Sequence, residues 1–162
     1  MATHQLNASR QDHATAYLLA IETFPKPSTH LEPLRKRRGT NPEAVFAVID
    51  ALRMDLQMRI GALHGNTSDR APPAYGYAHA SHRAPLEDRK TAYSLTLPKL
   101  PRVSPMWSRI IKNRADGSTA SGVFAVIEAL RIELYGKLGA LYTVNDPNFL
   151  SAPPLRSRSR TP

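Results

Sequence analysis

The sequence predicts a mainly helical protein made of two copies of a strand–helix–helix unit that pair with each other about a pseudo-twofold axis. Three observations predict this fold class: an internal repeat, apolar residues at helical spacing in each copy, and a short alternating segment near the start of each copy. A unit of about 50 residues rarely buries enough apolar surface alone. We therefore expect each copy to complete the core of the other.

The repeat is clearest over 19 positions, which read VFAVIDALRMDLQMRIGAL from Val45 and VFAVIEALRIELYGKLGAL from Val123. Twelve of these positions are identical and five more are conservative, which chance does not explain. We expect a flexible segment over 1–13, the first copy over 14–65, a linker over 66–89, the second copy over 90–143 and a disordered basic tail over 144–162.

The long helix of each copy is predicted from its caps and its apolar spacing. Asn41 and Pro42 suit the start of this helix in the first copy, Thr119 suits it in the second, and Gly65 suits the end of the first. Apolar residues at helical spacing form one stripe, which consists of Val45, Val48, Ile49, Leu52, Leu56, Ile60 and Leu63. A second face carries Ala47, Ala51, Met54 and Met58. A helix that is apolar on two sides is expected at the centre of a bundle, packed against its repeat partner.

A shorter helix is expected before each long helix, and a strand before that. In the second copy the short helix starts after the cap Ser104 and ends at Gly117, whereas in the first copy only Pro33 to Arg38 is expected to be helical. Alternating residues over 93–97 predict a strand that Pro98 ends, and 20–24 is its less regular counterpart. The two strands are expected to form a short antiparallel ribbon supported by the helices.

The charge balance favours a polyanionic partner over a basic surface kept for solubility. The 162 residues include 22 Lys and Arg against 13 Asp and Glu, for a net charge of +9. There is no cysteine, which excludes disulfides and thiolate sites. The polar start is unlike a signal peptide, and no apolar run is long enough to cross a membrane. We expect a soluble protein, cytoplasmic or nucleoid-associated, that is not secreted and has no membrane partner.

Motifs for catalysis are absent from the sequence. It holds no phosphate-binding glycine loop, no nucleophile elbow and no HExxH motif, and the repeated carboxylates pair with bases along their helices. His79 and His82 have a spacing seen in metal sites but lack a further ligand. We therefore predict no enzyme, no cofactor and no metal site.

The order strand, proline, short helix, basic end, glycine, cap and long helix resembles the ribbon-helix-helix DNA-binding family. The segments that carry the resemblance are LRKRRGTNPEAVFAVIDAL, from Leu34, and TLPKL, from Thr96. Two units in one chain resemble the tandem ribbon-helix-helix accessory proteins of conjugative plasmids. The resemblance implies that the two strands pair and enter the major groove of DNA.

The same resemblance implies a set of nucleic-acid-binding residues. Three groups follow from it: those facing the bases (Thr23, Ala92, Ser94 and Thr96), those placing helix N-termini at phosphates (Thr40, Asn41, Ser118 and Thr119), and those adding positive charge (Lys36, Arg37, Arg38, Lys112 and Arg114). None of the base-facing residues is Arg, Lys, Asn or Gln, the types that discriminate bases best.

The predicted function is binding of double-stranded DNA, sequence-tolerant or specific, by a small regulator of transcription or accessory factor. One alternative is a small helical protein of viral type that grips duplex RNA through its phosphates. Another is an assembly protein that uses the repeat for self-association. The sequence leaves open whether the two copies pair within one chain or between two chains.

Overall fold

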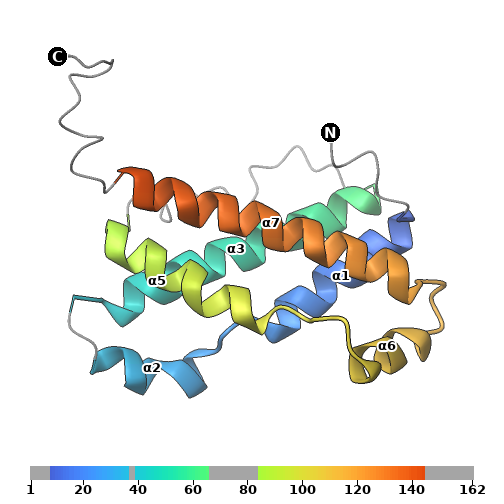
Figure 1. Cartoon of the computed structure of the whole chain (residues 1–162), viewed down its shortest axis with the longest axis horizontal. Coiled ribbons are helices and arrows are strands. Elements are labelled where there is room, and N and C mark those ends of the chain that lie inside the picture. Colours follow the sequence, from blue (N-terminus) through green and yellow to red (C-terminus); the bar gives the residue numbers. More distant parts are fainter. Residues whose placement is uncertain (1–7, 37–38, 66–83, 145–162) are drawn as a thin grey trace, which may run out of the picture.

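The computed structural model describes residues 8–36, 39–65 and 84–144 (Figure 1). The first copy of the repeat supplies α1 (Arg10–Thr23), α2 (Pro27–Arg35) and α3 (Pro42–Leu63). The second copy supplies α5 (Leu86–Thr96), the short 3-10 helix η2 (Leu97–Lys99), α6 (Pro105–Lys112) and α7 (Ala120–Val144). The predicted linker and basic tail lie largely outside the described residues.

The two segments predicted as strands are helical, so the predicted ribbon-helix-helix fold class is wrong. Residues 20–23 end α1, and residues 93–97 end α5 and enter η2. The part of the chain that the structure describes contains no strand, and no antiparallel ribbon joins the copies there. The prolines that follow these segments end helices instead of strands.

The starts of α1 and α5 explain why helix prevails over strand. Ser9 opens α1 with a capping box, in which Ser9 Oγ accepts from the Asp12 amide while the Asp12 carboxylate accepts from the Ser9 amide. In α5, Glu87 and Asp88 lie in the first turn, where negative charge stabilises a helix. A five-residue alternation cannot outweigh these signals, because a helix also accommodates it.

Four helices, two from each copy, form the bundle. The shorter helices α1 and α5 each pack against both long helices, α3 and α7. Each of them therefore contacts the long helix of its own copy and that of the other copy. The short helices α2 and α6 lie outside this bundle, where α2 packs on α3 and α6 packs on α7 (Figure 1).

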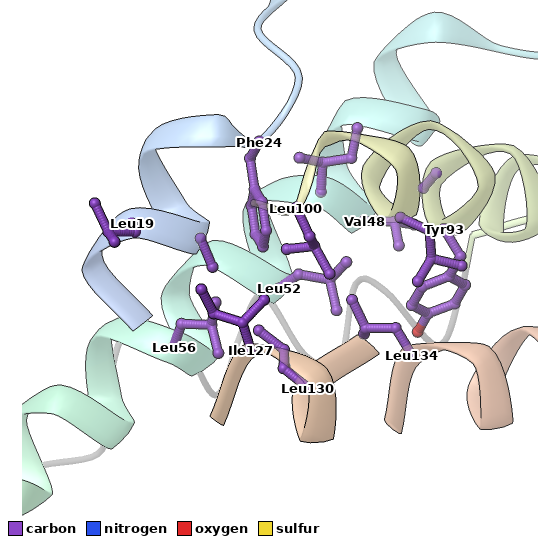
Figure 2. Close-up of a cluster of buried hydrophobic side chains, with 14 of the residues drawn as sticks. Leu19, Phe24, Val48, Leu52, Leu56, Tyr93, Leu100, Ile127, Leu130 and Leu134 are labelled. Carbon is purple, nitrogen blue, oxygen red and sulfur yellow. The ribbon is translucent and has the colours of Figure 1, made fainter. Parts of the chain in front are cut away.

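The shared core is lined by equivalent residues of the two copies (Figure 2). Leu52 and Leu56 of α3 face Leu130 and Leu134 of α7, and these four side chains are at most 7% exposed. Phe24, at the end of α1, is buried with them. Complete burial of one such side chain contributes about 1.5–3 kcal/mol. Because the cluster draws on both copies, neither copy closes this core by itself.

The predicted ends of the long helices are confirmed. The Asn41 side chain accepts a hydrogen bond from a first-turn amide of α3, and the Thr119 hydroxyl does the same in α7. Gly39 and Gly117 precede the two helices with φ of 83° and 87°, and Gly65 follows α3 with φ of 81°. These values are left-handed, which favours glycine at each of the three positions.

The short helices differ from their predicted bounds. Ser104 caps α6 as predicted, but α6 ends at Lys112, five residues before Gly117. Its counterpart α2 begins at Pro27 and includes Pro33 in its interior, whereas the helix was predicted to begin at Pro33. Proline at the first position suits a helix start, which accounts for the earlier beginning.

The second apolar face of the long helices is not fully buried, contrary to the prediction. Met58 on α3 is 42% exposed and Ile132 on α7 is 63% exposed. The reason is that α1 and α5 each pack against both long helices. The second faces of the long helices therefore do not pack against each other. None of the described helices has the length and apolar character that crossing a bilayer requires.

Candidate nucleic-acid interface

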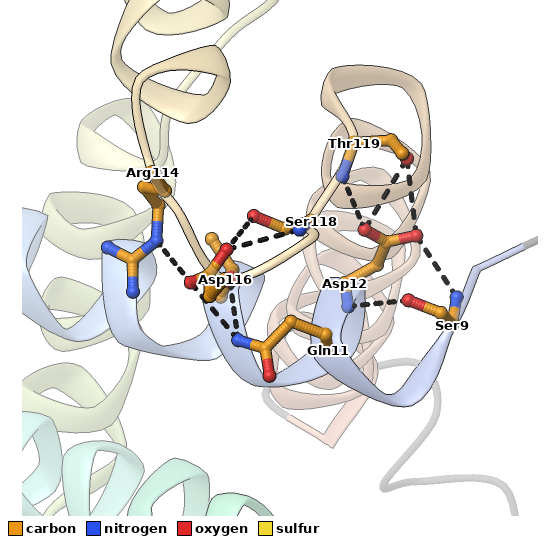
Figure 3. Close-up of polar contacts among 8 residues, drawn as sticks. Ser9, Gln11, Asp12, Arg114, Asp116, Ser118 and Thr119 are labelled. Atoms are coloured by element: carbon orange, nitrogen blue, oxygen red, sulfur yellow. Dashed lines mark hydrogen bonds and ion pairs between the residues drawn. The ribbon is translucent and has the colours of Figure 1, made fainter.

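The N-termini of the two long helices are occupied by carboxylates of the protein itself. Asp12 of α1 accepts a hydrogen bond from the Thr119 amide at 2.7 Å, at the start of α7 (Figure 3). Asp88 of α5 accepts one from the Asn41 amide at 2.8 Å, at the start of α3. Helices α1 and α5 thus each cap the long helix of the other copy. The amides of Asn41 and Thr119, predicted to face phosphates, are used within the fold.

Burial and hydrogen bonding act in opposite directions on Asp12. Burial raises its pKa, but hydrogen bonds from Thr119 and Ser9 outweigh burial, so the pKa lies below its usual range. Asp12 is therefore a carboxylate near neutral pH. Its negative charge lies at the positive end of the α7 dipole, where it stabilises the helix.

The neighbouring residues of the α6–α7 loop are also engaged internally. Asp116 accepts hydrogen bonds from the Ser118 amide and hydroxyl, from Arg114 Nε at 2.8 Å and from Gln11 of α1 at 3.1 Å (Figure 3). The bonds from Ser118 and then Arg114 hold the pKa of Asp116 well below its usual range, although burial opposes them. Arg114 and Ser118 are thus engaged with Asp116 in a cluster at the surface of the protein.

The residues predicted to face DNA bases do not form a surface. Ala92 and Thr96 are fully buried on α5, where Thr96 Oγ1 donates to the Ala92 carbonyl at 2.8 Å. Thr23 Oγ1 donates to a carbonyl of its own helix at 2.9 Å. Ser94 is exposed. Because a helix turns these side chains in different directions, the predicted base-reading face is absent from the described structure.

Of the predicted basic residues, Lys36 and Lys112 are exposed. They follow α2 and end α6, respectively. Arg37 and Arg38 lie outside the described residues, as do His79 and His82. Thr40, before α3, is half-buried, and its hydroxyl donates to the Leu34 carbonyl at 3.4 Å.

Most described carboxylates are paired with bases away from α2 and α6. Along the helices, Asp50 pairs with Arg53 and Glu128 with Arg131. Between the copies, Arg59 of α3 binds Glu133 of α7 through two hydrogen bonds of 2.7 and 3.2 Å. Burial raises the pKa of Glu133, but Arg59 outweighs it and lowers the pKa below its usual value. Of the other described carboxylates, Asp12 and Asp88 accept hydrogen bonds from amides at the starts of the long helices, and the exposed Glu22 and Glu43 have no described basic partner.

The exposed bases without a carboxylate partner among the described residues lie mainly on one edge. Figure 1 shows α2 and α6 at the two ends of this edge, with the chain that follows α5 between them. We name it the basic edge, and its exposed members are Lys26, Lys36, Lys99, Arg102, Arg109 and Lys112. An edge that gathers six exposed bases suits a linear polyanion.

Sequence reasoning had missed Lys26, Lys99, Arg102 and Arg109. A signal was present in the sequence, because no acidic residue occurs over 97–115 while five basic residues do. That this segment lies on the same edge of the molecule as α2 could be seen only in the tertiary structure. Within the described ranges, no cluster of His, Asp and Glu is arranged to hold a metal ion.

The comparisons with known proteins give no relative. No family model matches the sequence, and neither a curated protein nor a solved structure matches it.

Proposed function

We propose that this protein binds double-stranded nucleic acid through the basic edge, by contacts to phosphates that tolerate any sequence. The observation that supports the proposal is the separation of charge: most described carboxylates are engaged in caps and ion pairs, while the exposed members of the basic edge have no carboxylate partner among the described residues. Such a surface supplies affinity without reading bases.

The residues of the basic edge favour this mode of binding over groove reading. Exposed lysine and arginine side chains can contact phosphates of any sequence, because the phosphates are present whatever the bases are. No strand is present in the described part to enter a groove. The role that fits is that of a small accessory factor that coats or bridges duplex segments.

Titration of a labelled DNA duplex at several salt concentrations tests the proposal. The logarithm of the affinity should fall linearly with the logarithm of salt concentration, with a slope of about −0.9 for each phosphate contact. Lys36→Ala combined with Arg109→Ala should weaken binding to all duplexes and make the slope shallower by about 2. Arg53→Ala, which removes an arginine paired with Asp50 on α3, is the matched control and should leave the slope unchanged.

An unchanged slope in the double variant would refute the role of the basic edge. Absence of binding at about 0.15 M salt together with retained self-association would favour the assembly function instead. Competition between duplex DNA and duplex RNA then identifies the preferred polymer, because the two present their phosphates in different helical geometries.

A further inference from the structure

The short helix α6 has one broad apolar face, and only part of this face is buried. Its inner side carries Ile111, which is fully buried, and Trp107, which is half-buried. Its outer side carries Met106 and Ile110, one helical turn apart, which are 55% and 39% exposed. Val103, just before the cap of α6, is 76% exposed. These three outer side chains form a local apolar patch and not a scatter of single exposed residues.

Basic residues surround this patch and no acid interrupts them. Arg102 and Arg109 are the direct sequence neighbours of Val103 and Ile110, and both are exposed. Lys112 ends the helix and is also exposed. The nearest acid on the C-terminal side is Asp116, which is engaged with Arg114. The patch therefore combines apolar contact area with an unneutralised positive border.

The described side chains of the equivalent helix in the first copy, α2, do not show this combination. In α2 the exposed positions whose side chains are described include Pro27, Thr29, Glu32 and Pro33. Glu32 pairs with Arg35 at 2.9 Å, which neutralises part of the positive charge on α2. Among the described side chains, the exposed apolar patch is thus found on α6 and not on α2.

We propose that α6 and the segment before it form a peripheral docking site for a bilayer surface that carries anionic headgroups. Val103, Met106 and Ile110 enter the boundary between headgroups and acyl chains, which removes apolar surface from water. The stems of Arg102, Arg109 and Lys112 lie along the same boundary while their charged ends reach headgroup phosphates. This contact needs no spanning helix.

The chemistry of the patch favours a bilayer over a second nucleic-acid contact. Phosphates of a duplex would engage Arg102 and Arg109 but would leave the three apolar side chains in water. None of these three is aromatic, so none offers a ring on which a base could stack. The α6 end of the basic edge would therefore be shared by lipid and nucleic acid, whereas Lys36 on the α2 end would serve nucleic acid only.

Flotation of the full chain with vesicles tests the proposal. Binding is expected to vesicles of phosphatidylcholine mixed with phosphatidylserine, and not to vesicles of phosphatidylcholine alone. Val103→Ser combined with Met106→Ser should lower the partition coefficient by about tenfold, because both side chains lose apolar burial. Arg109→Ala should lower it by about fivefold. Because these side chains are exposed, thermal melts should show that the variants remain folded.

Two control variants separate this site from other surfaces. Ile132→Ser removes an exposed apolar side chain from α7, which is 63% exposed in the native chain, and should leave vesicle binding unchanged. Lys36→Ala should weaken duplex binding but not vesicle binding. The proposal is overturned by equal binding to both vesicle types, by absence of binding at low salt, or by full vesicle binding of the Val103→Ser, Met106→Ser variant. Loss of duplex binding in that variant, without vesicle binding by the native chain, assigns the patch to nucleic acid instead.

Discussion

The two junctions that join the copies use the same residue in the same place but hold it differently. At the junction of α1 and α7, Asp12 accepts hydrogen bonds from the Thr119 amide, the Thr119 hydroxyl and the Ser9 amide. At the junction of α5 and α3, Asp88 accepts a single described hydrogen bond, from the Asn41 amide. The first junction is further tied by Asp116, which accepts hydrogen bonds from Gln11 and Thr15 of α1.

The difference originates in residues outside the helices. Ser9, just before α1, donates its amide to Asp12, whereas the equivalent Pro85, just before α5, has no amide hydrogen to donate. Both capping carboxylates belong to the same short pattern, Asp-x-x-Thr-Ala-Tyr, at Asp12 and at Asp88. The loop before α7, however, carries Asp116 just ahead of its glycine, whereas the loop before α3 carries Arg38 there. A repeated sequence therefore reproduces the packing of the helices, while single loop residues decide how firmly each junction is held.

The largest effect is expected in the core, where the copies are equivalent. Leu56 and Leu134 hold matching positions and are each 2% exposed. Leu56→Ala and Leu134→Ala should each lower the free energy of unfolding by about 2–5 kcal/mol, because each leaves a cavity in the shared cluster. Chemical denaturation measures both. A loss below about 1 kcal/mol in either variant would show that its side chain is not part of a buried shared core.

At the junctions the two copies should differ. Asp12→Ala should lower the free energy of unfolding by about 2–3 kcal/mol, because it leaves the Thr119 and Ser9 donors without an acceptor. Asp88→Ala should cost only about 1 kcal/mol, the usual value of one cap. Denaturant titration measures both losses. If Asp88→Ala costs as much as Asp12→Ala or more, the junction at Asp12 is not the more firmly held of the two.

The space around Asp12 gives a prediction of smaller size. A Cβ added at Gly122 would lie 2.0 Å from Asp12 Oδ2, so Gly122→Ala must displace the carboxylate and should cost about 1–2 kcal/mol. Gly136 is the matched control on the same helix, since no atom lies within 4 Å of its added Cβ. There the same change should stabilise by up to about 1 kcal/mol. If thermal melts show that both substitutions stabilise the protein, Gly122 does not lie as close to the Asp12 carboxylate as the structure shows.

The pH dependence of stability should follow the depressed pKa of Asp12. Because its pKa is lower in the folded state, its contribution is fully present above the unfolded value of about 3.9. That contribution is lost as the pH falls below this value towards the folded pKa. In Asp12→Asn the loss of stability between pH 5 and pH 2 should be smaller than in the native chain, because about one titrating group fewer contributes. An identical acid profile would show that the pKa of Asp12 does not differ between the folded and unfolded states.

The smallest effects are expected for ion pairs. Arg59 and Glu133 join the two copies and are about one-third exposed, at 32% and 35%. A double-mutant cycle on this pair should give a coupling of about 1 kcal/mol, because two hydrogen bonds are made in one geometry. Arg53 and Asp50 lie within one helix and should couple by about 0.3–0.5 kcal/mol. Equal couplings would remove any special role of the bond between the copies.

Predictions from the sequence succeed where a signal is local. The caps Asn41 and Ser104, and the left-handed glycine at Gly65, are confirmed because each depends on a few adjacent residues. The strands at 20–24 and 93–97 are wrong because a five-residue alternation is also compatible with a helix. The capping box of α1 and the acidic first turn of α5 favour the helix. The candidate site was predicted only in part, at Lys36 and Lys112, since grouping bases on an edge requires the packing of α2 and α6.

The sequence by itself determined that the chain consists of two related units with long amphipathic helices and a surplus of positive charge. The repeat, the caps and the composition carry this information without any three-dimensional context. Only the tertiary structure decided that Asp12 and Asp88 cap the helix of the opposite copy, and that α6 presents an apolar patch. The physical reason is that burial and capping depend on residues about 50 to 110 positions away, which local pattern and propensity do not register.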